Sequence, residues 1–222
     1  MNKKLSVSLM CANLMKMAKD VEVLDDNLVD WFHLDIMDGH FVPNLTFGPD
    51  FCNALSRISE TPLDYHLMLD NPAQFIHAVK LRPQDYVTIH SELPADVINS
   101  TLPLIKQLGA HVGLAVNPDT PIEAVQPYVS DIDLVLLMLV RPGFAGQKMI
   151  EGIMDKVSQM KELLKKNGRE DILISVDGNI TLERAAYMGK MGADVFVGGT
   201  SAIFHKDEPL EDTIPAFYQA VK

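Results

Sequence analysis

Histidine and aspartate side chains recur in this sequence within short apolar runs, where they could bind a metal ion or transfer protons. The run Trp31–Met37 carries His33 and Asp35 two residues apart, followed at the same spacing by Met37. Alternate residues of a β-strand point to the same face of a sheet. We therefore expect one imidazole and one carboxylate to project together from this segment.

Two further runs end in similar residues. His66 shares a predicted strand face with Met68, and Asp177 lies at the end of a run that continues into Gly178. Any one of these side chains could be a hydrogen-bonded structural residue. Two histidines and two aspartates at three strand ends would be costly to bury without partners. A divalent cation with nitrogen and oxygen ligands would compensate that polarity.

Two glycine-rich loops follow later runs and could bind a phosphate group. They are Pro142–Gln147 and Gly198–Ser201, and neither matches a nucleotide-binding fingerprint. Glycine lets backbone N–H groups approach an anion, and barrels commonly bind phosphate at the loops after their last strands. Either loop alone could be a tight turn, but their pairing on late strands favours a phosphate site.

Three of the 12 methionines, Met37, Met68 and Met138, lie near predicted strand ends. Their thioether side chains could form a polarizable lining that excludes water from reacting carbons. Ordinary packing in the protein core is the competing interpretation, and it suits most of the other methionines, which have helical spacing.

Eight short apolar runs alternate with helix-like stretches such as Ile153–Leu164 and Leu182–Met191, in which apolar residues recur three and four apart. The predicted strands are Leu5–Leu9, Trp31–Met37, Leu63–Leu69, Tyr86–His90, His111–Val116, Leu134–Val140, Ile172–Asp177 and Val195–Gly198. Eight such strands close a barrel, so we expect an α/β fold, a single-domain (β/α)8 TIM barrel spanning 1–222. Gly109 and Gly192 should each end a helix just before a strand. The alternative is an open doubly wound sheet.

The composition excludes several classes of partner. The 222 residues are 22% charged, with a formal net charge of −11, so we expect neither nucleic acid nor a membrane surface as a partner. The basic segment Met1–Leu5 leads into no long apolar run. We therefore expect no signal peptide, no membrane span and a cytoplasmic location. Cys11 and Cys52 lack CxxC spacing and should be packing residues rather than a disulfide or a zinc site.

The ordered motifs resemble the ribulose-phosphate 3-epimerase family over nearly the whole chain. The longest is HLDIMDGHFVPNLTFGP at 33–49. The supporting motifs are, in order, Ser8–Met10, His66–Met68, Asn117–Pro121, Pro142–Gln147, Val176–Gly178 and Gly199–Phe204.

This resemblance implies a metal-dependent 3-epimerase that acts on a small phosphorylated ketose through an enediolate. It implies one divalent cation per chain, Zn, Fe, Mn or Co, and we also expect a homo-oligomer. The implied metal ligands are His33, Asp35, His66 and Asp177, and Asp35 and Asp177 would also be the acid/base pair on opposite faces of the substrate. The other implied substrate contacts are Ser8, His66, the cap Met37, Met68 and Met138, and the phosphate-side residues Gly143, Phe144, Ala145, Gly146, Gly178, Asn179, Gly199, Thr200 and Ser201.

Three positions depart from the usual family pattern. Asn13 stands where Asp is usual, Ser175 where Glu is usual, and Arg141 where Asn or Asp precedes Pro-Gly-Phe. None is an implied ligand, so we expect catalysis to be retained. His90 and Glu92 are similar to the family's residues, although the sequence assigns them no role.

Other features resemble the D-allulose-6-phosphate 3-epimerase branch. They are Phe-Ala-Gly at 144–146, Asn179, and Gly-Thr-Ser at 199–201. We therefore expect the pair D-allulose 6-phosphate and D-fructose 6-phosphate as substrates. The alternative is the pair D-ribulose 5-phosphate and D-xylulose 5-phosphate.

Other functions would need different residues. A Schiff-base aldolase needs a lysine at a barrel-facing strand end, and none is predicted there, since Lys148 follows the loop after the sixth strand. A decarboxylase acting on phosphorylated sugars is a related alternative. A non-catalytic phosphate-binding barrel is more distant, because all four implied ligands are present.

Overall fold

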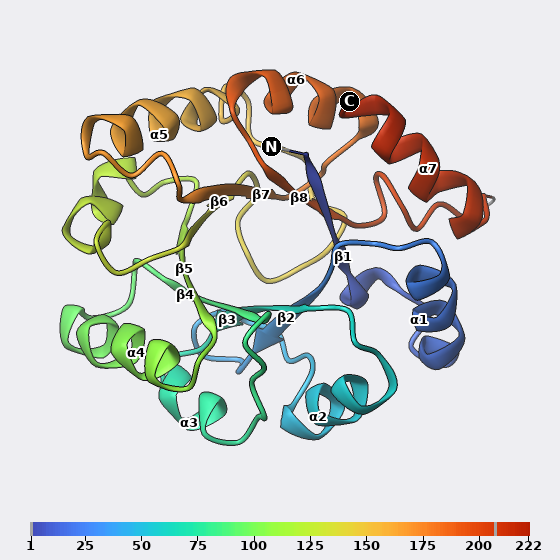
Figure 1. Ribbon diagram of the computed structural model, residues 1–222, viewed down its shortest axis with the longest axis horizontal. Helices are drawn as coiled ribbons and strands as arrows, with labels where there is room; N and C mark the ends of the chain where they lie inside the picture. The colour runs from blue at the N-terminus through green and yellow to red at the C-terminus, as the bar shows by residue number, and fades with distance from the viewer. Residues whose placement is uncertain (1, 207) are drawn as a thin grey trace.

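Each predicted apolar run forms a strand in the computed structural model, which describes residues 2–206 and 208–222. The strands are β1 (Lys4–Ser8), β2 (Trp31–Met37), β3 (Leu63–Met68), β4 (Tyr86–His90), β5 (His111–Val116), β6 (Leu134–Met138), β7 (Leu173–Asp177) and β8 (Val195–Gly198). Each strand pairs in parallel with its neighbours, and β8 pairs with β1 to close the barrel (Figure 1). The predicted TIM barrel is confirmed, and the open sheet is excluded.

Helices surround the barrel (Figure 1). They are α1 (Met17–Asp26), α2 (Pro49–Ile58), α3 (Pro72–Ile76), α4 (Ala95–Gln107), α5 (Asp155–Lys166), α6 (Leu182–Met191) and α7 (Leu210–Ala220), with the 3-10 turns η1 (Leu9–Cys11) and η2 (Ile122–Tyr128). Gly109 and Gly192 follow α4 and α6 with φ values of +86° and +118°, which confirms their predicted place at helix ends.

The predicted strands β1, β3 and β6 end one or two residues earlier than the sequence indicates. Leu9 already belongs to the turn η1, and β6 stops at Met138 rather than at Val140. The Leu139 carbonyl instead accepts a hydrogen bond from the Ile150 backbone N–H at 3.0 Å, so the chain leaves the barrel there. Apolar side chains continue beyond the last hydrogen bond between neighbouring strands. The apolar pattern therefore predicts strands that are one or two residues too long.

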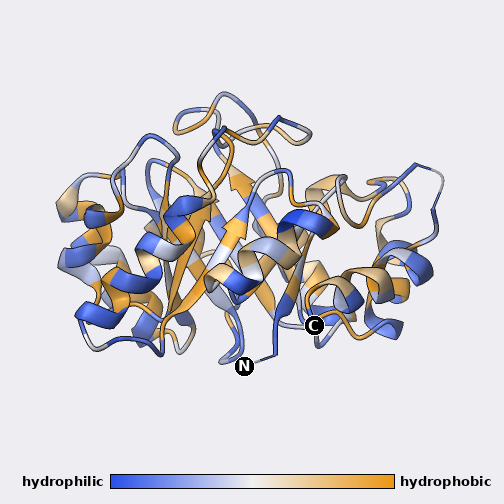
Figure 2. Cartoon of the chain, turned by 90° about the horizontal axis from the view of Figure 1, so that it is seen from above, coloured by the Kyte–Doolittle hydropathy of each residue, from blue (hydrophilic) through white to orange (hydrophobic). Residues whose placement is uncertain are grey.

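Two layers of side chains follow from the alternation along each strand. Leu34 and Ile36 of β2 belong to the main core between barrel and helices. Inside the barrel, a second cluster fills the lumen with Trp31, Ala115, Leu134, Leu136, Met138, Val195 and Val197. Figure 2 shows apolar strands at the centre of the molecule and polar residues toward the outer faces of the helices. The predicted two-residue period of β2 is therefore confirmed.

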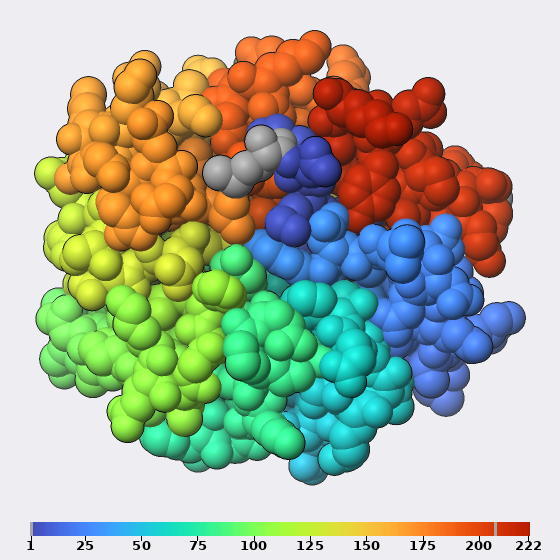
Figure 3. All heavy atoms as spheres, viewed as in Figure 1, coloured from blue at the N-terminus to red at the C-terminus, as the bar shows by residue number. Residues whose placement is uncertain are grey.

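The two ends of the barrel differ. At the end that carries the N-terminal segment, Figure 3 shows atoms of neighbouring elements closing over the barrel axis. At the opposite end, where the strands finish, long loops extend beyond the barrel (Figure 2). Functional sites of this fold lie at the carboxyl ends of strands. Cys11 and Cys52 are free thiols, and no helix within the described residues is long and apolar enough to cross a membrane.

Candidate metal centre and active site

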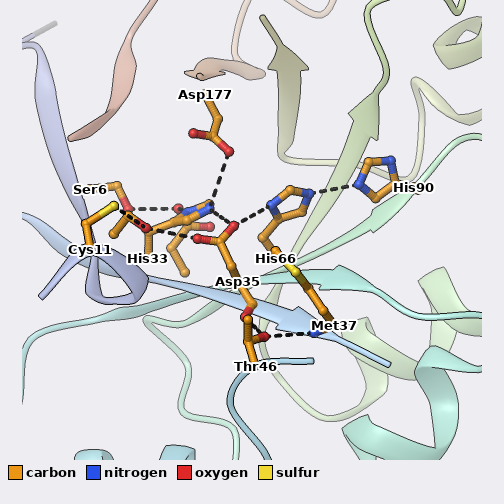
Figure 4. A network of polar contacts seen from close by, with 11 residues as sticks. Ser6, Cys11, His33, Asp35, Met37, Thr46, His66, His90 and Asp177 are labelled. Atoms are coloured by element: carbon orange, nitrogen blue, oxygen red, sulfur yellow. Dashed lines mark hydrogen bonds and ion pairs between the residues drawn. The ribbon is translucent and has the colours of Figure 1, made fainter. Parts of the chain in front are cut away.

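Strands β2 and β3 place three of the four predicted metal ligands together. Asp35 pairs with His66 in the parallel register, so their side chains are neighbours on the inner face. The Asp35 Oδ1 atom lies 3.2 Å from His66 Nδ1 and 3.3 Å from His33 Nε2. Asp177 reaches in from β7, with Oδ2 at 4.0 Å from His33 Nε2 (Figure 4). The four ligand atoms all lie within 4.8 Å of one another.

This cluster is largely withdrawn from solvent. His33 and His66 are completely buried, Asp35 is 7% exposed, and Asp177 is half-buried at the mouth. The His33 Nε2 atom is buried, yet no described residue offers it a hydrogen bond of acceptable geometry. Imidazole nitrogen and carboxylate oxygen are ligands that transition metals and zinc accept. These four residues therefore fit a divalent cation.

Asp64, which the sequence analysis did not single out, orients the first of these histidines. Its Oδ2 atom accepts hydrogen bonds from His33 Nδ1 at 2.7 Å and from Ser6 Oγ at 2.8 Å. Because an ionised carboxylate only accepts, Nδ1 carries a hydrogen, and Nε2 faces Asp35 and Asp177. Histidine ligands commonly donate their other N–H to a carboxylate in this way. Asp64 lies two residues before His66 on the same strand face, which was the signal available in the sequence.

In the metal-free protein, bound protons offset part of the negative charge of this cluster. Burial opposes the protonation of His33, but the charges of Asp35 and Asp64 outweigh it and raise the pKa of His33 well above its ordinary value. Metal binding would displace this proton. Burial would raise the pKa of Asp35, but His33 and His66 lower it overall. Burial, followed by the charge of Asp35, raises the pKa of Asp177 to about 7. Near neutral pH, Asp35 is therefore ionised, whereas Asp177 still carries a proton in part of the molecules.

One cavity at the strand ends brings together most of the predicted substrate contacts. The predicted residues that line it are Ser8, Asp35, Met37, Met68, Met138, Gly143, Phe144, Ala145, Gly146, Asp177, Gly178, Asn179, Gly199, Thr200 and Ser201. His33 and His66 are not among its lining residues. Met10 and Cys11, which carried no functional prediction, also line the cavity. Cys11 is a partly buried free thiol, and the turn η1 places it at this cavity.

Three side chains hold Asp35 and the loops at the cavity in position. The Ser8 hydroxyl donates a hydrogen bond to Asp35 Oδ2 at 2.9 Å. Asn179 has a positive φ of +53°, and its side-chain amide donates to Ser201 Oγ at 3.3 Å. The Arg184 guanidinium donates to the Asn179 carbonyl at 2.9 Å and also to its side-chain oxygen. These contacts tie the loop after β7 to the loop after β8.

The remaining positions of interest lie around this cavity. Arg141 is exposed and forms an ion pair with Asp119 at 3.0 Å. Ser175 is buried below Asp177, and its hydroxyl has no hydrogen-bond partner within the described part of the chain. His90 Nε2 lies 2.8 Å from His66 Nε2, and His90 Nδ1 lies 2.9 Å from Glu92 Oε2.

The charges of this histidine pair and its carboxylate follow from burial and hydrogen bonding. Burial lowers the pKa of His66, and it lowers the pKa of His90 to about 4. For Glu92, burial opposes ionisation, but hydrogen bonds from His90, Thr120 and the Asn117 backbone bring its pKa down to about 2. At neutral pH, the imidazoles of His66 and His90 are therefore neutral and Glu92 is ionised.

Comparisons with known proteins agree with this geometry. The family model for the ribulose-phosphate 3 epimerase family matches residues 4–204. The ribulose-phosphate 3-epimerase of Bacillus subtilis is 35% identical over 204 residues, covering 92% of this chain and 94% of the relative. The enzyme of the same name from Methanocaldococcus jannaschii is 38% identical, covering 92% of this chain and 86% of its own length.

Solved structures share the fold at much lower sequence identity. KGPDC from Streptococcus mutans superposes with a TM-score of 0.68 at 15% identity, covering 100% of this chain and 98% of that chain. A 3-hexulose-6-phosphate synthase from Salmonella typhimurium gives a TM-score of 0.68 at 17% identity, with 98% of each chain covered. At this level of identity, the similarity concerns the barrel alone.

The raised pKa of Asp177 should make the metal-free protein lose stability as pH rises. The folded state holds a proton up to a pKa of about 7, whereas the ordinary value is 3.8. The stabilisation is complete below about pH 4 and is lost as pH rises toward 7. Each pKa unit corresponds to about 1.4 kcal/mol. Between about pH 4 and pH 6.5, we expect wild type to lose at least roughly 2 kcal/mol of unfolding free energy relative to Asp177→Asn.

Urea unfolding in the presence of a chelator measures this difference. His90, whose pKa is lowered, changes stability in the opposite sense over the same range, so only the comparison between the two proteins isolates Asp177. Glu170→Gln removes an exposed carboxylate and should follow the wild-type pH profile. Parallel profiles for wild type and Asp177→Asn would contradict the assigned protonation of Asp177.

Proposed function

The chain belongs to the ribulose-phosphate 3-epimerase family, and from this premise we propose that it inverts carbon 3 of a phosphorylated ketose with Asp35 and Asp177 as its acid/base pair. It is an isomerase, an epimerase that acts on carbohydrate phosphates. The observation that carries the proposal is a pair of carboxyl groups, one buried and one half-buried, that line one cavity. The charge of His33 lowers the pKa of Asp35, whereas burial and the charge of Asp35 raise the pKa of Asp177 to about 7.

His33, Asp35, His66 and Asp177 would together hold one divalent cation, for which Zn, Fe, Mn and Co are all candidates. When bound, the cation would supply the positive charge that stabilises the negative charge developing on the substrate carbonyl oxygen. The unpartnered His33 Nε2 atom and the two adjacent carboxylates support this assignment. The chain's own side chains would then carry out the proton transfers.

Inversion needs a base on one face of carbon 3 and an acid on the other. Asp35 projects from β2 and Asp177 from β7, so the two carboxyl groups approach the cavity from different strands (Figure 4). Asp35, kept ionised by the charge of His33, would remove the proton from one epimer. Asp177, with its raised pKa, would return a proton to the opposite face. The roles exchange in the reverse direction, which a pair with separated pKa values permits.

The cavity lining would protect the planar enediolate and hold the phosphate. Met37 and Met68 pack in one apolar cluster with Val42, and Met138 lies on β6 across the cavity. These side chains would exclude water from the reacting carbon. The loops Gly143–Gly146, Gly178–Asn179 and Gly199–Ser201 would present backbone N–H groups to the phosphate, as barrel loops after late strands commonly do.

For the substrate, we propose D-allulose 6-phosphate and D-fructose 6-phosphate. Support comes from Phe-Ala-Gly at 144–146, from Asn179 and from Gly-Thr-Ser at 199–201, all of which line the cavity. The second candidate pair is D-ribulose 5-phosphate and D-xylulose 5-phosphate, which the names of the relatives favour.

The two-carboxylate mechanism predicts separate losses for two amide variants. Asp35→Asn and Asp177→Asn should each lower epimerisation by at least roughly 100-fold beyond any loss of metal, since general acid–base groups contribute about 10²–10⁴-fold. Metal content and exchange of the C3 hydrogen in deuterated water should be measured on the same samples. Each variant should still exchange one epimer, and the preferred epimer should differ between the two.

Asp70→Asn is the matched control, because Asp70 follows β3 at the same rim but is exposed and does not line the cavity. It should retain wild-type turnover. Near-normal turnover in metal-loaded Asp177→Asn would restrict this carboxylate to a ligand role and rule out the two-carboxylate mechanism.

The substrate proposal predicts a preference in kcat/KM. After chelation and reloading with each candidate metal, D-allulose 6-phosphate should react with a kcat/KM at least about 10-fold above that of D-ribulose 5-phosphate. Coupled assays for each product measure both values on one preparation. A preference for ribulose 5-phosphate with every metal would assign the pentulose pair instead.

A further inference from the structure

Two further side chains, His90 and Glu92, form a chain of polar contacts with the second histidine of the cluster, and the proposed reaction assigns them no role. His66 Nε2 lies 2.8 Å from His90 Nε2, and His90 Nδ1 lies 2.9 Å from Glu92 Oε2. Both histidines are completely buried. Figure 4 shows His90 on the side of His66 that faces away from Asp35 and Asp177.

Hydrogen-bonding capacity fixes where each hydrogen of this chain would lie once a cation is bound. The Glu92 carboxylate can only accept, so His90 Nδ1 carries a hydrogen. A neutral imidazole has one N–H group, so His90 Nε2 is an acceptor and His66 Nε2 must donate to it. His66 is then left with its lone pair on Nδ1, which the cation would accept in place of a hydrogen bond to Asp35. This is the atom that lies 3.2 Å from Asp35 Oδ1, inside the ligand cluster.

We propose that His90 and Glu92 are positioning residues that hold His66 in the tautomer able to bind the metal. The inference rests on the metal site of the proposed function and adds the residues that prepare it. Asp64 does the same for His33 directly, through the 2.7 Å contact with Nδ1. The two histidines are thus oriented by two different carboxylates, one adjacent and one acting through His90.

The Glu92 carboxylate is itself anchored at both oxygens. While Oε2 faces His90, Oε1 accepts hydrogen bonds from the Asn117 backbone N–H at 2.9 Å and from Ser91 Oγ at 3.2 Å. Both sides of the carboxylate therefore face donors.

The segment that carries the Asn117 donor is fixed in turn by Lys156. The Lys156 ammonium donates to the carbonyl oxygens of Asn117, Pro118 and Thr120 at 3.1, 2.6 and 2.6 Å. The backbone N–H of Asn117 is thus held in place. The side chain at position 92 must therefore accept a hydrogen bond from Asn117 on one side and another from His90 on the other.

Glu92→Gln tests the proposal because the amide keeps the size of the side chain but accepts on one side only. If its oxygen stays with the fixed Asn117 N–H, its NH2 group faces His90 Nδ1. Each hydrogen bond in the chain must then reverse its direction, which places a hydrogen on His66 Nδ1. We expect the affinity for Zn²⁺ to fall about 10- to 100-fold, the size typical of partners that orient metal ligands.

Two measurements at one fixed pH report the effect. Competition with a chelator gives the Zn²⁺ affinity, and ¹H–¹⁵N NMR of the metal-free protein shows which imidazole nitrogens carry hydrogen. His90 Nδ1 should carry a hydrogen in the wild type and should lack one in Glu92→Gln. A merely structural role for Glu92 would not move this NMR signature.

Glu123→Gln is the matched control, since it makes the same change at an exposed carboxylate of η2, and it should keep wild-type affinity. His90→Phe is a second variant that keeps a ring against Phe41, which packs on His90 with ring centroids 4.8 Å apart. It removes the acceptor for His66 Nε2 and should lower Zn²⁺ affinity to a similar degree. Thermal unfolding of each metal-free variant verifies the fold.

Unchanged Zn²⁺ affinity in Glu92→Gln and His90→Phe, with an unchanged His90 signature in Glu92→Gln, would overturn the proposal. An equal loss of affinity in Glu123→Gln would also overturn it, because the effect would not depend on the Glu92 carboxylate. A wild-type protein that binds no Zn²⁺ would overturn both this inference and the proposed metal site. Tight wild-type binding that neither variant weakens overturns the inference alone.

Discussion

The convergence of two carboxylates and two imidazoles in one buried space is the constraint on which the rest of the site depends. The ligand atoms of His33, Asp35, His66 and Asp177 lie within 4.8 Å of one another. A buried charge without compensation costs several kcal/mol. Protons on His33 and Asp177 relieve this repulsion in the metal-free protein, and a divalent cation would relieve it in the loaded protein. The same repulsion separates the protonation preferences of the two carboxyl groups, which is what inversion at one carbon requires.

The barrel makes this arrangement possible by separating packing from chemistry along each strand. In β2, Leu34 and Ile36 face the helices, while His33 and Asp35 face the lumen. The in-register pairing of β2 with β3 sets Asp35 beside His66 and sets His33 beside Asp64 one layer deeper. The apolar cluster in the lumen supports this polar layer from below, so the ligands are held by rigid strands rather than by loops.

Much of this could be predicted from the sequence, because the signals are local. Alternation of strands and helices gives the barrel, and the two-residue period places His33 and Asp35 on one face. The positioning residues were harder to find. Asp64 belongs to the same face as His66, but only the register of β2 and β3 shows that it meets His33. His90 and Glu92 depend on side-chain reach across β3, β4 and the segment at Asn117, which no sequence period encodes. The connection from β5 to β6 was also not predictable from the apolar pattern. It is the 3-10 turn η2, which contains Pro127 and so lacks one backbone N–H donor.

We propose that these four side chains hold one catalytic divalent metal, and anomalous diffraction from crystals reloaded with Zn²⁺ tests this. We expect one peak per chain, about 2.0–2.1 Å from His33 Nε2 and from His66 Nδ1, with an oxygen of Asp35 and an oxygen of Asp177 completing the ligands. A barrel mouth without a peak, in crystals of protein whose activity withstands complete chelation, would contradict it.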